Sequence, residues 1–365
     1  MQDCEQLINL LTESIERNHA DALLLSGGLD SSILASILRP QYSLAAGFGT
    51  AAPDLVYARQ VAERYSKHHV EVVFGQNKMA ELVEQVIQIF RTFDPIEIRN
   101  SAVALAGIEW AKSDGYSSIM TGDGSDELFA GYNYFSRYYS DMQRFDSELR
   151  RLWQIMHFSS RKLGEYTGIE VKTPFLDEKF ASFAKLINVN DKVGEHDGKK
   201  WGKFILRKCF EPALASLVWR PKLAQEQGAA TDRYQHYIEE MIDNLTFANK
   251  KRIAQEQESV TIRSKEHLHY YAIFRSYFPP PKEEEEEDDD DDYDDYRRSS
   301  GGRRTRRGFG GMGRSRVGRD EEGRFTSTRS SNRGRDEERD QQEPKIHHRR
   351  HVHARGKFLG FLDPR

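Results

Sequence analysis

"LLLSGGLDSS", residues 23–32, decides the fold, because an apolar run ends abruptly at a serine and two glycines before a new apolar segment begins. This order predicts a buried strand, a tight turn and the first turn of a helix that runs to about Leu38. The backbone N–H groups at the start of that helix converge and favour an anion there. A strand-to-helix turn capped by serine fits the same residues, so the stretch alone leaves two interpretations open.

The segments around this turn alternate between two patterns. Four apolar runs predict short buried strands, at 22–26, 44–49, 68–74 and 117–122. Apolar residues at helical spacing predict helices around them, over about 3–18, from Pro53, over about 79–90 and over about 101–114. This alternation predicts βαβ units and an α/β fold, a doubly wound parallel sheet whose ligands bind at the carboxyl ends of the strands.

Composition divides the 365 residues into two parts. Residues 1–280 have an ordinary globular pattern, which is mainly helical over 125–278. From Pro279 onward the chain changes to an acidic block, EEEEEDDDDDYDDY at 283–296, followed by an arginine-rich remainder. Blocks of like charge seldom fold alone. We therefore predict one domain over 1–280 and a disordered low-complexity tail over 281–365.

The chain lacks the marks of membrane and secreted proteins. It has no run of 18 apolar residues, and its start, MQDCEQLINLL, has neither the basic nor the apolar region of a signal peptide. We expect a cytoplasmic protein with no membrane partner. Cys4 and Cys209 are too few for a disulfide framework and fit no metal spacing, so both are expected to be free thiols.

A second polar run, TGDGSDELFAGY at 121–132, directly follows the fourth predicted strand. It places the carboxylates of Asp123, Asp126 and Glu127 within five positions, which is costly without a cation or a bound proton. Asp30 is equally out of place in an anion site unless a magnesium ion bridges it to the phosphate. The order D-G-S-D-E does not match a calcium loop, and a solvated acidic loop is the alternative.

The glycine-rich turn does not match the common nucleotide-binding motifs. No lysine follows it as in G-x-x-x-x-G-K-[ST], and the spacing is not G-x-G-x-x-G. Dinucleotide binding is therefore disfavoured.

Four motifs together resemble the asparagine synthetase family, specifically its ATP-using synthetase domain. Beside the two runs above, these are VKTPFLDEKF at 171–180 and VWRPK at 218–222. The resemblance covers about residues 15–280, and S-G-G-x-D-S alone marks the wider ATP-pyrophosphatase group. It implies an adenine nucleotide alpha-hydrolase-like fold and a stand-alone synthetase domain.

The resemblance implies a carbon–nitrogen ligase that uses ATP and magnesium. Such an enzyme adenylates the side-chain carboxylate of aspartate, releases pyrophosphate, and lets ammonia displace AMP to give asparagine. Two alternatives stay open. One is the same adenylation on another acceptor, such as a lactam precursor, a small-molecule carboxylate or a tRNA base. The other is an inactive, RNA-associated relative.

The resemblance also implies roles for individual residues. Pyrophosphate would be held by Ser26, Gly27, Gly28, Asp30 and Ser31. Adenosine would be received by Leu25, Ala46, Thr121 and Gly122. Magnesium would be held by Asp30 and Asp126, and Lys222 would neutralise phosphate charge in the transition state. Asp123 would handle a proton during nucleophilic attack, and Asp177 and Glu127 would lie near the substrate, although Asp177 could equally cap the helix that starts near Glu178.

Two departures from the family bear on the substrates. No glutaminase-like domain precedes S-G-G, so we expect free ammonia or a separate glutaminase subunit as the nitrogen source. The segment LAQEQGAAT at 223–231 differs from the loop that approaches the substrate in the bacterial enzymes, and this leaves the acceptor open.

The tail resembles no part of the family. Its arginine, glycine and scattered aromatic residues suit RNA binding, but the adjacent acidic block would compete, and a solvated extension is favoured. HHRRHVH at 347–353 is a weak candidate for a transition metal.

Overall fold

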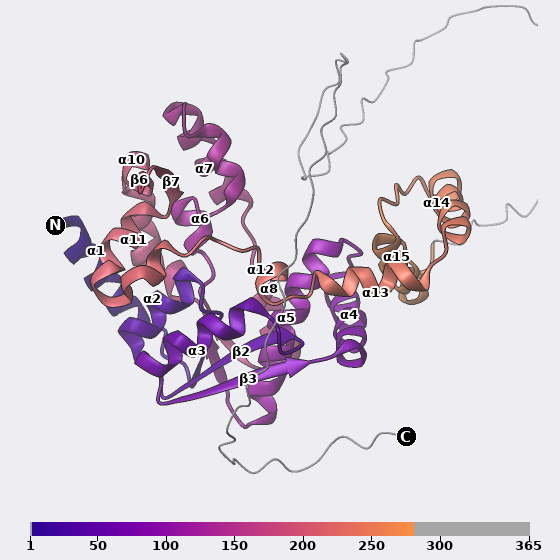
Figure 1. Ribbon diagram of the computed structural model, residues 1–365, viewed down its shortest axis with the longest axis horizontal. Coiled ribbons are helices and arrows are strands. Elements are labelled where there is room, and N and C mark those ends of the chain that lie inside the picture. Colours follow the sequence, from indigo (N-terminus) through magenta and orange to yellow (C-terminus); the bar gives the residue numbers. More distant parts are fainter. Residues whose placement is uncertain (1, 281–365) are drawn as a thin grey trace, which may run out of the picture. The chain divides into compact units, whose positions relative to one another are not determined.

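The structure is a computed structural model that describes residues 2–280, which belong to one compact unit, Met1–Glu285. Its centre is a five-stranded parallel sheet in the order β3-β2-β1-β4-β5, and β2 and β3 are seen side by side in Figure 1. The strands are β1 (Ala22–Leu24), β2 (Tyr42–Phe48), β3 (His68–Phe74), β4 (Ser118–Met120) and β5 (Glu170–Lys172). The α/β fold class and the four predicted strands are confirmed. The fifth strand, which overlaps the start of the VKTPFLDEKF motif, was not predicted.

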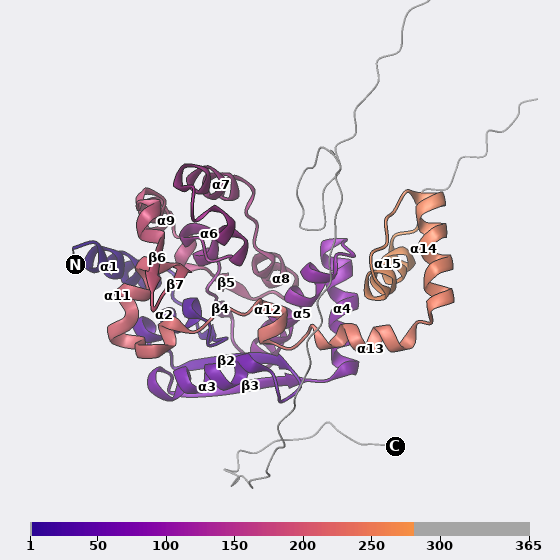
Figure 2. The same cartoon turned by 45° about the horizontal axis from the view of Figure 1, so that its top comes forward.

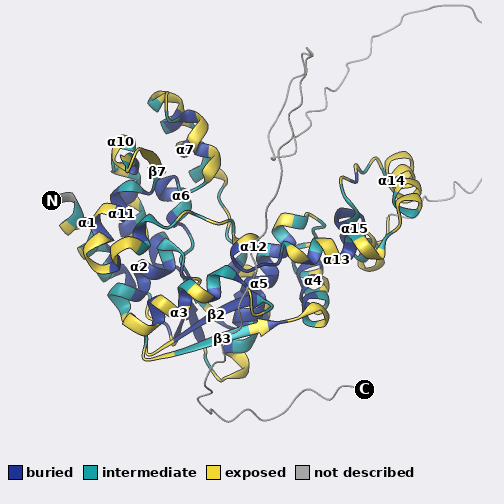
Figure 3. Cartoon of the chain, in the orientation of Figure 1, coloured by how far each residue is buried: buried dark blue, intermediate teal, exposed yellow. Residues whose placement is uncertain are grey.

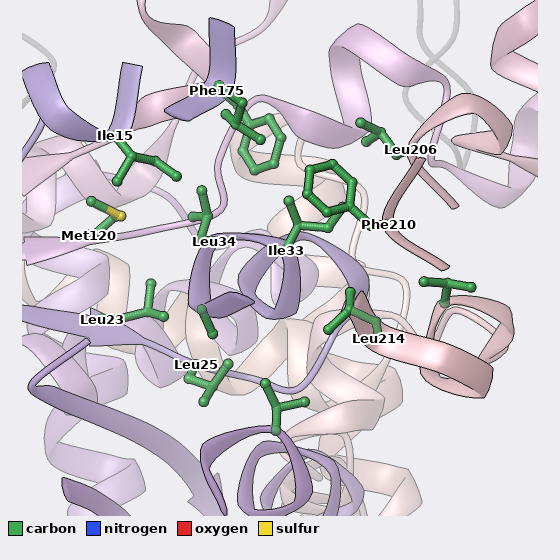
Figure 4. Packing of buried hydrophobic residues seen from close by; sticks show 14 of the residues in the cluster. Ile15, Leu23, Leu25, Ile33, Leu34, Met120, Phe175, Leu206, Phe210 and Leu214 are labelled. Atoms are coloured by element: carbon green, nitrogen blue, oxygen red, sulfur yellow. The ribbon is translucent and has the colours of Figure 1, made fainter. Parts of the chain in front are cut away.

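Helices cover both faces of the sheet, as expected for a doubly wound fold. One core cluster joins alternate strand residues, among them Leu23, Ala45 and Met120, to α1 (Gln2–Arg17), α2 (Leu29–Leu38) and α3 (Pro53–Tyr65) (Figure 4). The intervening strand residues, Ala22, Leu44 and Ile119, belong to a second cluster with α4 (Gln76–Phe90) and α5 (Pro95–Ser113). Successive strand side chains point to opposite faces, so each strand contributes to both clusters.

The helix α5 begins earlier than the predicted start near residue 101. Asp94 caps it, because its carboxylate accepts from the N–H groups of Ile96 and Glu97, and Pro95 occupies the first turn. Aspartate followed by proline is a strong helix start.

The later part of the domain is mainly helical, as predicted, with one exception. A two-stranded antiparallel hairpin is formed by β6 (Val193–His196) and β7 (Lys199–Gly202). The helical elements are α6 (Ser125–Phe129), η1 (Asn133–Tyr138), α7 (Met142–Ile155), α8 (Ser159–Thr167), η2 (Pro174–Leu176), α9 (Glu178–Leu186), α10 (Val189–Lys192), α11 (Phe204–Leu214), η3 (Ala215–Trp219), α12 (Gln225–Gly228), α13 (Arg233–Met241), α14 (Asn244–Glu258) and α15 (Lys265–Tyr277).

Helices α13 and α15 lie beside α4 in both views, and α14 lies farther from it (Figures 1 and 2). A buried ion pair ties them to the sheet domain, because Arg99 of α5 contacts Glu266 of α15 at 2.6 Å. Tyr270 is fully buried and donates to the same carboxylate. Most of α14 is exposed (Figure 3).

The two cysteines form a disulfide, so the prediction of free thiols was wrong. Cys4 lies in α1 and Cys209 in α11, with 5.1 Å between their Cα atoms. Both helices pack into the same core cluster, which brings together residues separated by 205 positions. No spacing rule could reveal this pairing, because helix packing creates it.

Among the helices of residues 2–280, none is long and apolar enough to cross a membrane. The predicted tail over 281–365, with its RNA-binding and histidine-cluster interpretations, lies outside the described residues.

Candidate functional site

Two loops meet at the carboxyl edge of the sheet because β1 and β4 are neighbours. These strands pair in parallel, with Leu23 opposite Met120. The chain therefore leaves both strands on the same side, into the turn before α2 and into the loop before α6. The approach is close, since a Cβ atom on Gly122 would lie 2.9 Å from the Cβ of Asp30. This is the point where strand order reverses, the usual ligand site of such sheets.

The turn before α2 is shaped for an anion. Gly27 has a φ of +69°, and a Cβ atom there would lie 2.4 Å from the backbone nitrogen of Ala58. Gly28 is the N-cap of α2, and no side chain caps the helix. The one serine contact to the backbone N–H groups here is at the N-cap itself, where the N–H of Gly28 donates to the Ser26 hydroxyl at 3.3 Å. The first N–H groups of α2 have no intrahelical acceptor, and the hydroxyls of Ser26 and Ser31 lie beside them, 3.3 Å apart.

Two aspartates and two lysines form a compact charged cluster beside this turn. The Lys203 ammonium lies 2.7 Å from both carboxylate oxygens of Asp30 and 2.7 Å from one oxygen of Asp126. Lys222 forms a second ion pair with Asp126. Lys203 has only 4% of its side chain exposed, whereas Lys222 has 26% exposed. Ser125 donates to Asp30 at 2.7 Å. Below, these four charged residues are called the lysine–aspartate cluster.

The charges of the lysine–aspartate cluster stabilise one another. Burial disfavours the carboxylate of Asp126, but the attraction of Lys203 and Lys222 outweighs it and holds the pKa of Asp126 well below its usual range. Burial likewise acts against the charged form of Lys203, yet Asp126 and Asp30 raise its pKa above the ordinary value. Asp126 and Lys203 are therefore both ionised at neutral pH.

Local backbone geometry lets Lys203 reach the cluster. Lys203 is the N-cap of α11 and has a φ of +55°, which is uncommon for a side-chain-bearing residue. A Cβ atom on Gly131 would lie 1.9 Å from Asp126 Oδ1 and 2.1 Å from Lys203 Cε. Only glycine at 131 leaves this path open. Sequence reasoning missed Lys203, and the glycine at 131 is the one local signal in its favour.

Asp123, the predicted proton-handling residue, has a different environment from Asp126. Its Oδ2 atom accepts from the hydroxyl of Thr121 at 3.0 Å and from the hydroxyl of Ser160 on α8. Burial raises the pKa of the Asp123 carboxyl, and the two hydroxyl hydrogen bonds offset this only in part. Burial thus favours the protonated form of Asp123 relative to that of an exposed aspartate.

Glu127 is adjacent to the cluster in sequence but is held elsewhere. The hydroxyl of Tyr132 donates to its carboxylate at 2.5 Å, and the indole of Trp153 donates to its backbone carbonyl. Burial raises the pKa of Glu127. The Lys222 ammonium lies over the Tyr132 ring, 4.6 Å from its centre. Glu127 therefore supports the wall of the site rather than joining the ion pairs.

Asp177 is not brought to the cluster. Its carboxylate caps α9 by accepting from the N–H of Phe180, and it forms an ion pair with Arg17 at 2.7 Å. The capping role is confirmed, and these contacts account for the aspartate without a substrate.

Leu25 and Ala46, which were predicted to receive adenosine, are both buried. Leu25 is fully buried directly after β1, and its N–H donates to the carbonyl of Leu44 on β2. Ala46, on β2, is 7% exposed. Side chains so buried leave mainly the backbone to face a ligand.

A second residue that sequence reasoning missed is Arg220. Its side chain is 9% exposed and donates to the carbonyl of Gly27 at 2.8 Å. It also forms an ion pair with Asp54 at 2.8 Å and lies 3.6 Å over the Tyr57 ring. Arg220 therefore links the turn before α2 to α3.

The segment 223–231 covers the carboxyl end of β2. The carbonyl of Ala229 accepts from the N–H of Phe48, and the side chain of Gln225 donates to the carbonyl of Asn100 on α5. A Cβ atom on Gly228 would lie 2.3 Å from Asp54. The segment that departs from the resembled family thus packs closely at the edge of the site.

Comparison with known proteins agrees with this architecture. The family model described as asparagine synthase matches residues 7–165 and 149–289. The chain belongs to the asparagine synthase family. It is 30% identical over 279 residues to the asparagine synthetase [glutamine-hydrolyzing] of Gallus gallus, a match that covers 70% of this chain and 48% of that relative. It is 31% identical over 287 residues to asparagine synthetase B [glutamine-hydrolyzing] of Escherichia coli (strain K12), covering 70% and 50%. The chain thus spans about half the length of these asparagine synthase relatives.

The side chains of this site supply too few ligands for a metal ion unless phosphate oxygens also bind it. Within residues 2–280 there is no group of three or more histidine, cysteine, aspartate or glutamate side chains arranged to hold one. Asp30 and Asp126 nevertheless reach a single ammonium, so one cation can contact both. Magnesium commonly binds through one or two carboxylates plus substrate phosphates, and the donor set matches that pattern.

Proposed function

We propose that the chain is an ATP-dependent amide synthetase that adenylates the side-chain carboxylate of aspartate and transfers ammonia to give asparagine, AMP and pyrophosphate. The observation that carries this proposal is the lysine–aspartate cluster beside the uncapped start of α2. It combines unpaired N–H donors, two buried or half-buried lysines and two carboxylates at the carboxyl edge of the sheet.

The turn and the lysines supply what a pyrophosphate group needs. The N–H groups at the start of α2 and the hydroxyls of Ser26 and Ser31 would donate to its oxygens. Lys222 is the more exposed lysine and lies at the rim of the cluster. Its ammonium would turn from Asp126 towards the phosphates as negative charge develops on the leaving group.

Asp30 and Asp126 would hold magnesium together with phosphate oxygens. When bound, the ion would neutralise phosphate charge. The buried Lys203 holds both carboxylates in place. Lys203 therefore prepares the two metal ligands, and its positive charge would add to the attraction for pyrophosphate.

The carboxylate that is activated would enter beside segment 223–231. This segment borders the end of β2 and the start of α5, where an acceptor would lie next to the α-phosphate. Its departure from the resembled family makes a different carboxylate the second candidate substrate. The nitrogen source would be free ammonia or a separate glutaminase subunit. The intact cluster, with all four charges paired, argues against an inactive relative that only binds RNA.

An exchange assay tests the proposal. Radiolabelled pyrophosphate should enter ATP when the full chain is given magnesium and the right carboxylate, because adenylation is reversible. Aspartate should stimulate exchange, and asparagine should form when ammonium is added. If only another carboxylic acid stimulates exchange, that acid and not aspartate is the substrate. A chain that shows no exchange with any of a panel of carboxylates is not an adenylating enzyme.

A further inference from the structure

One oxygen of Asp123 receives two hydrogen bonds, which leaves the other oxygen for chemistry. Both Thr121 and Ser160 donate to Oδ2. Asp123 is half-buried, so its carboxyl borders the site. Two donors on the same oxygen fix the rotation of the carboxyl group and direct Oδ1 away from them.

The two donors have different origins. Thr121 lies two residues before Asp123 in the same loop, so its contact is local. Ser160 comes from α8, 37 residues later, and is 7% exposed. A hydroxyl from a different helix restrains the loop against the body of the domain, which a local contact cannot do.

Helix packing fixes the position of Ser160. Leu163 is fully buried in the second core cluster. A Cβ atom on Gly164 would lie 2.6 Å from the carbonyl of Ile169 and 2.6 Å from the Val171 side chain, so α8 lies directly against β5. The Ser160 hydroxyl is therefore presented by a rigid element. Sites held by packed elements keep more accurate geometry than sites on loops.

We propose that Ser160 is a positioning residue that orients the Asp123 carboxyl for attack by the amine on the acyl-adenylate. This inference rests on the proposed function and assigns Ser160 to its second half-reaction. The carboxyl of an aspartate is carried on a single methylene, so its reach is short and depends on the group being held in one orientation.

In that step a bond forms between the ammonia nitrogen and the acyl carbon. One N–H proton passes to Oδ1 of Asp123, the bond from the acyl carbon to the phosphate oxygen breaks, and AMP leaves with the electron pair. The proton later goes to water. Because the carboxyl must lie within about 3 Å of that proton, a free rotation of Asp123 would slow this step and not adenylation.

Ser160→Ala tests the proposal in the full chain. We expect ATP/pyrophosphate exchange within about twofold of wild type, whereas amide formation falls about 10- to 100-fold, because misplacement of a catalytic group costs up to about 100-fold. The adenylate would then be lost to hydrolysis, seen as AMP formed without amide. Ser160→Thr keeps the hydroxyl and should restore amide formation.

Ser159→Ala is the matched control, because Ser159 is the neighbouring residue in the same helix turn and makes no described side-chain contact with Asp123. It should behave as wild type in both assays. If Ser160→Ala proves poorly folded by circular dichroism, Ser160→Cys keeps the size and weakens the donor, and the same separation of the two activities is expected.

Three results would overturn the inference. Ser160→Ala could form amide at the wild-type rate, or lose exchange and amide formation equally, or the threonine variant could fail to restore amide formation. These differ from failure of the proposed function itself, in which the wild-type chain shows no exchange with any carboxylate.

Discussion

Two carboxylates three residues apart, Asp123 in the loop before α6 and Asp126 in the first turn of α6, have opposite electrostatic environments. Asp126 lies against two lysines, and its pKa is held low. Asp123 has hydroxyl partners and no described ion pair, and burial raises its pKa. Active sites commonly separate the pKa values of paired groups to give them separate roles. The difference suits the roles proposed above, in which Asp126 binds magnesium and phosphate and Asp123 takes a proton.

The largest effect is expected from Lys203→Met, which removes the central cation. Asp30 and Asp126 would be left close together with one partner fewer, and breaking a buried ion pair costs about 3–5 kcal/mol. Urea unfolding should show this loss, and ATP/pyrophosphate exchange should disappear. Lys208→Met, an exposed lysine on the same helix, is the control. A stable Lys203→Met protein with normal exchange would contradict the role given to the cluster.

Lys222→Met should lower the exchange rate strongly and change the folding stability little. Lys222 is more exposed than Lys203 and pairs with one aspartate only, so the stability should change little. Exchange should fall about 100- to 1,000-fold, as for loss of one preorganised electrostatic donor. Titration of exchange rate against ATP will distinguish a lower maximal rate from weaker binding. An unchanged maximal rate would show that Lys222 only binds nucleotide.

The disulfide gives a test of how the cluster is supported. It ties α1 to α11, the helix that begins after Lys203. Cys4→Ser should lower the free energy of unfolding by about 2–5 kcal/mol, and the exchange rate in the folded protein should fall less than for Lys222→Met. Mass spectrometry of protein alkylated without reductant should find no free thiol. Two free thiols would refute the cross-link.

The smallest changes in folding stability are expected from replacing the carboxylates of Asp126 and Asp123, and the two changes should have opposite signs. The folded pKa of Asp126 lies below its unfolded value of 3.8, so the carboxylate stabilises the fold above that pH and this contribution is lost as pH falls further. Asp126→Asn should therefore destabilise at pH 7 by at least about 1 kcal/mol.

The folded pKa of Asp123 lies above 3.8, so the wild type loses stability as pH rises from that value through the folded pKa. Asp123→Asn should be more stable than wild type at pH 7, and this advantage should vanish near the unfolded pKa. Urea unfolding midpoints of both variants at neutral and acidic pH check the signs. Changes in stability of the same sign at pH 7 would remove the contrast between the two carboxylates.

Most of the fold was predictable from local patterns. Apolar runs bounded by glycine and helical spacing of apolar residues located β1 to β4 and the helices around them, because these elements bury continuous apolar faces. The short strand β5 and the hairpin of β6 and β7 were missed. Each has only three or four residues and is largely half-buried or exposed, so its pattern is too weak to stand out.

The candidate site was predictable only in part. The two glycine-rich loops were found because their polar residues follow strands directly. Lys203 and Arg220 were missed because they meet the first loop across 173 and 193 residues. Ser160 meets Asp123 across 37 residues. Local sequence patterns do not predict contacts between residues so far apart in the chain.

The sequence by itself determined β1 to β4 and the helices around them, the two polar loops and the family to which they belong, since each depends on residues close together along the chain. Tertiary structure alone decided which carboxylates pair with lysines and which one has hydroxyl partners. The parallel pairing of β1 with β4 brings Asp30 beside Asp126, and the path of α11 brings Lys203 between them. Packing of α8 supplies the hydroxyl for Asp123. Burial and distance set the pKa of each carboxylate, and neither quantity exists until the chain is folded.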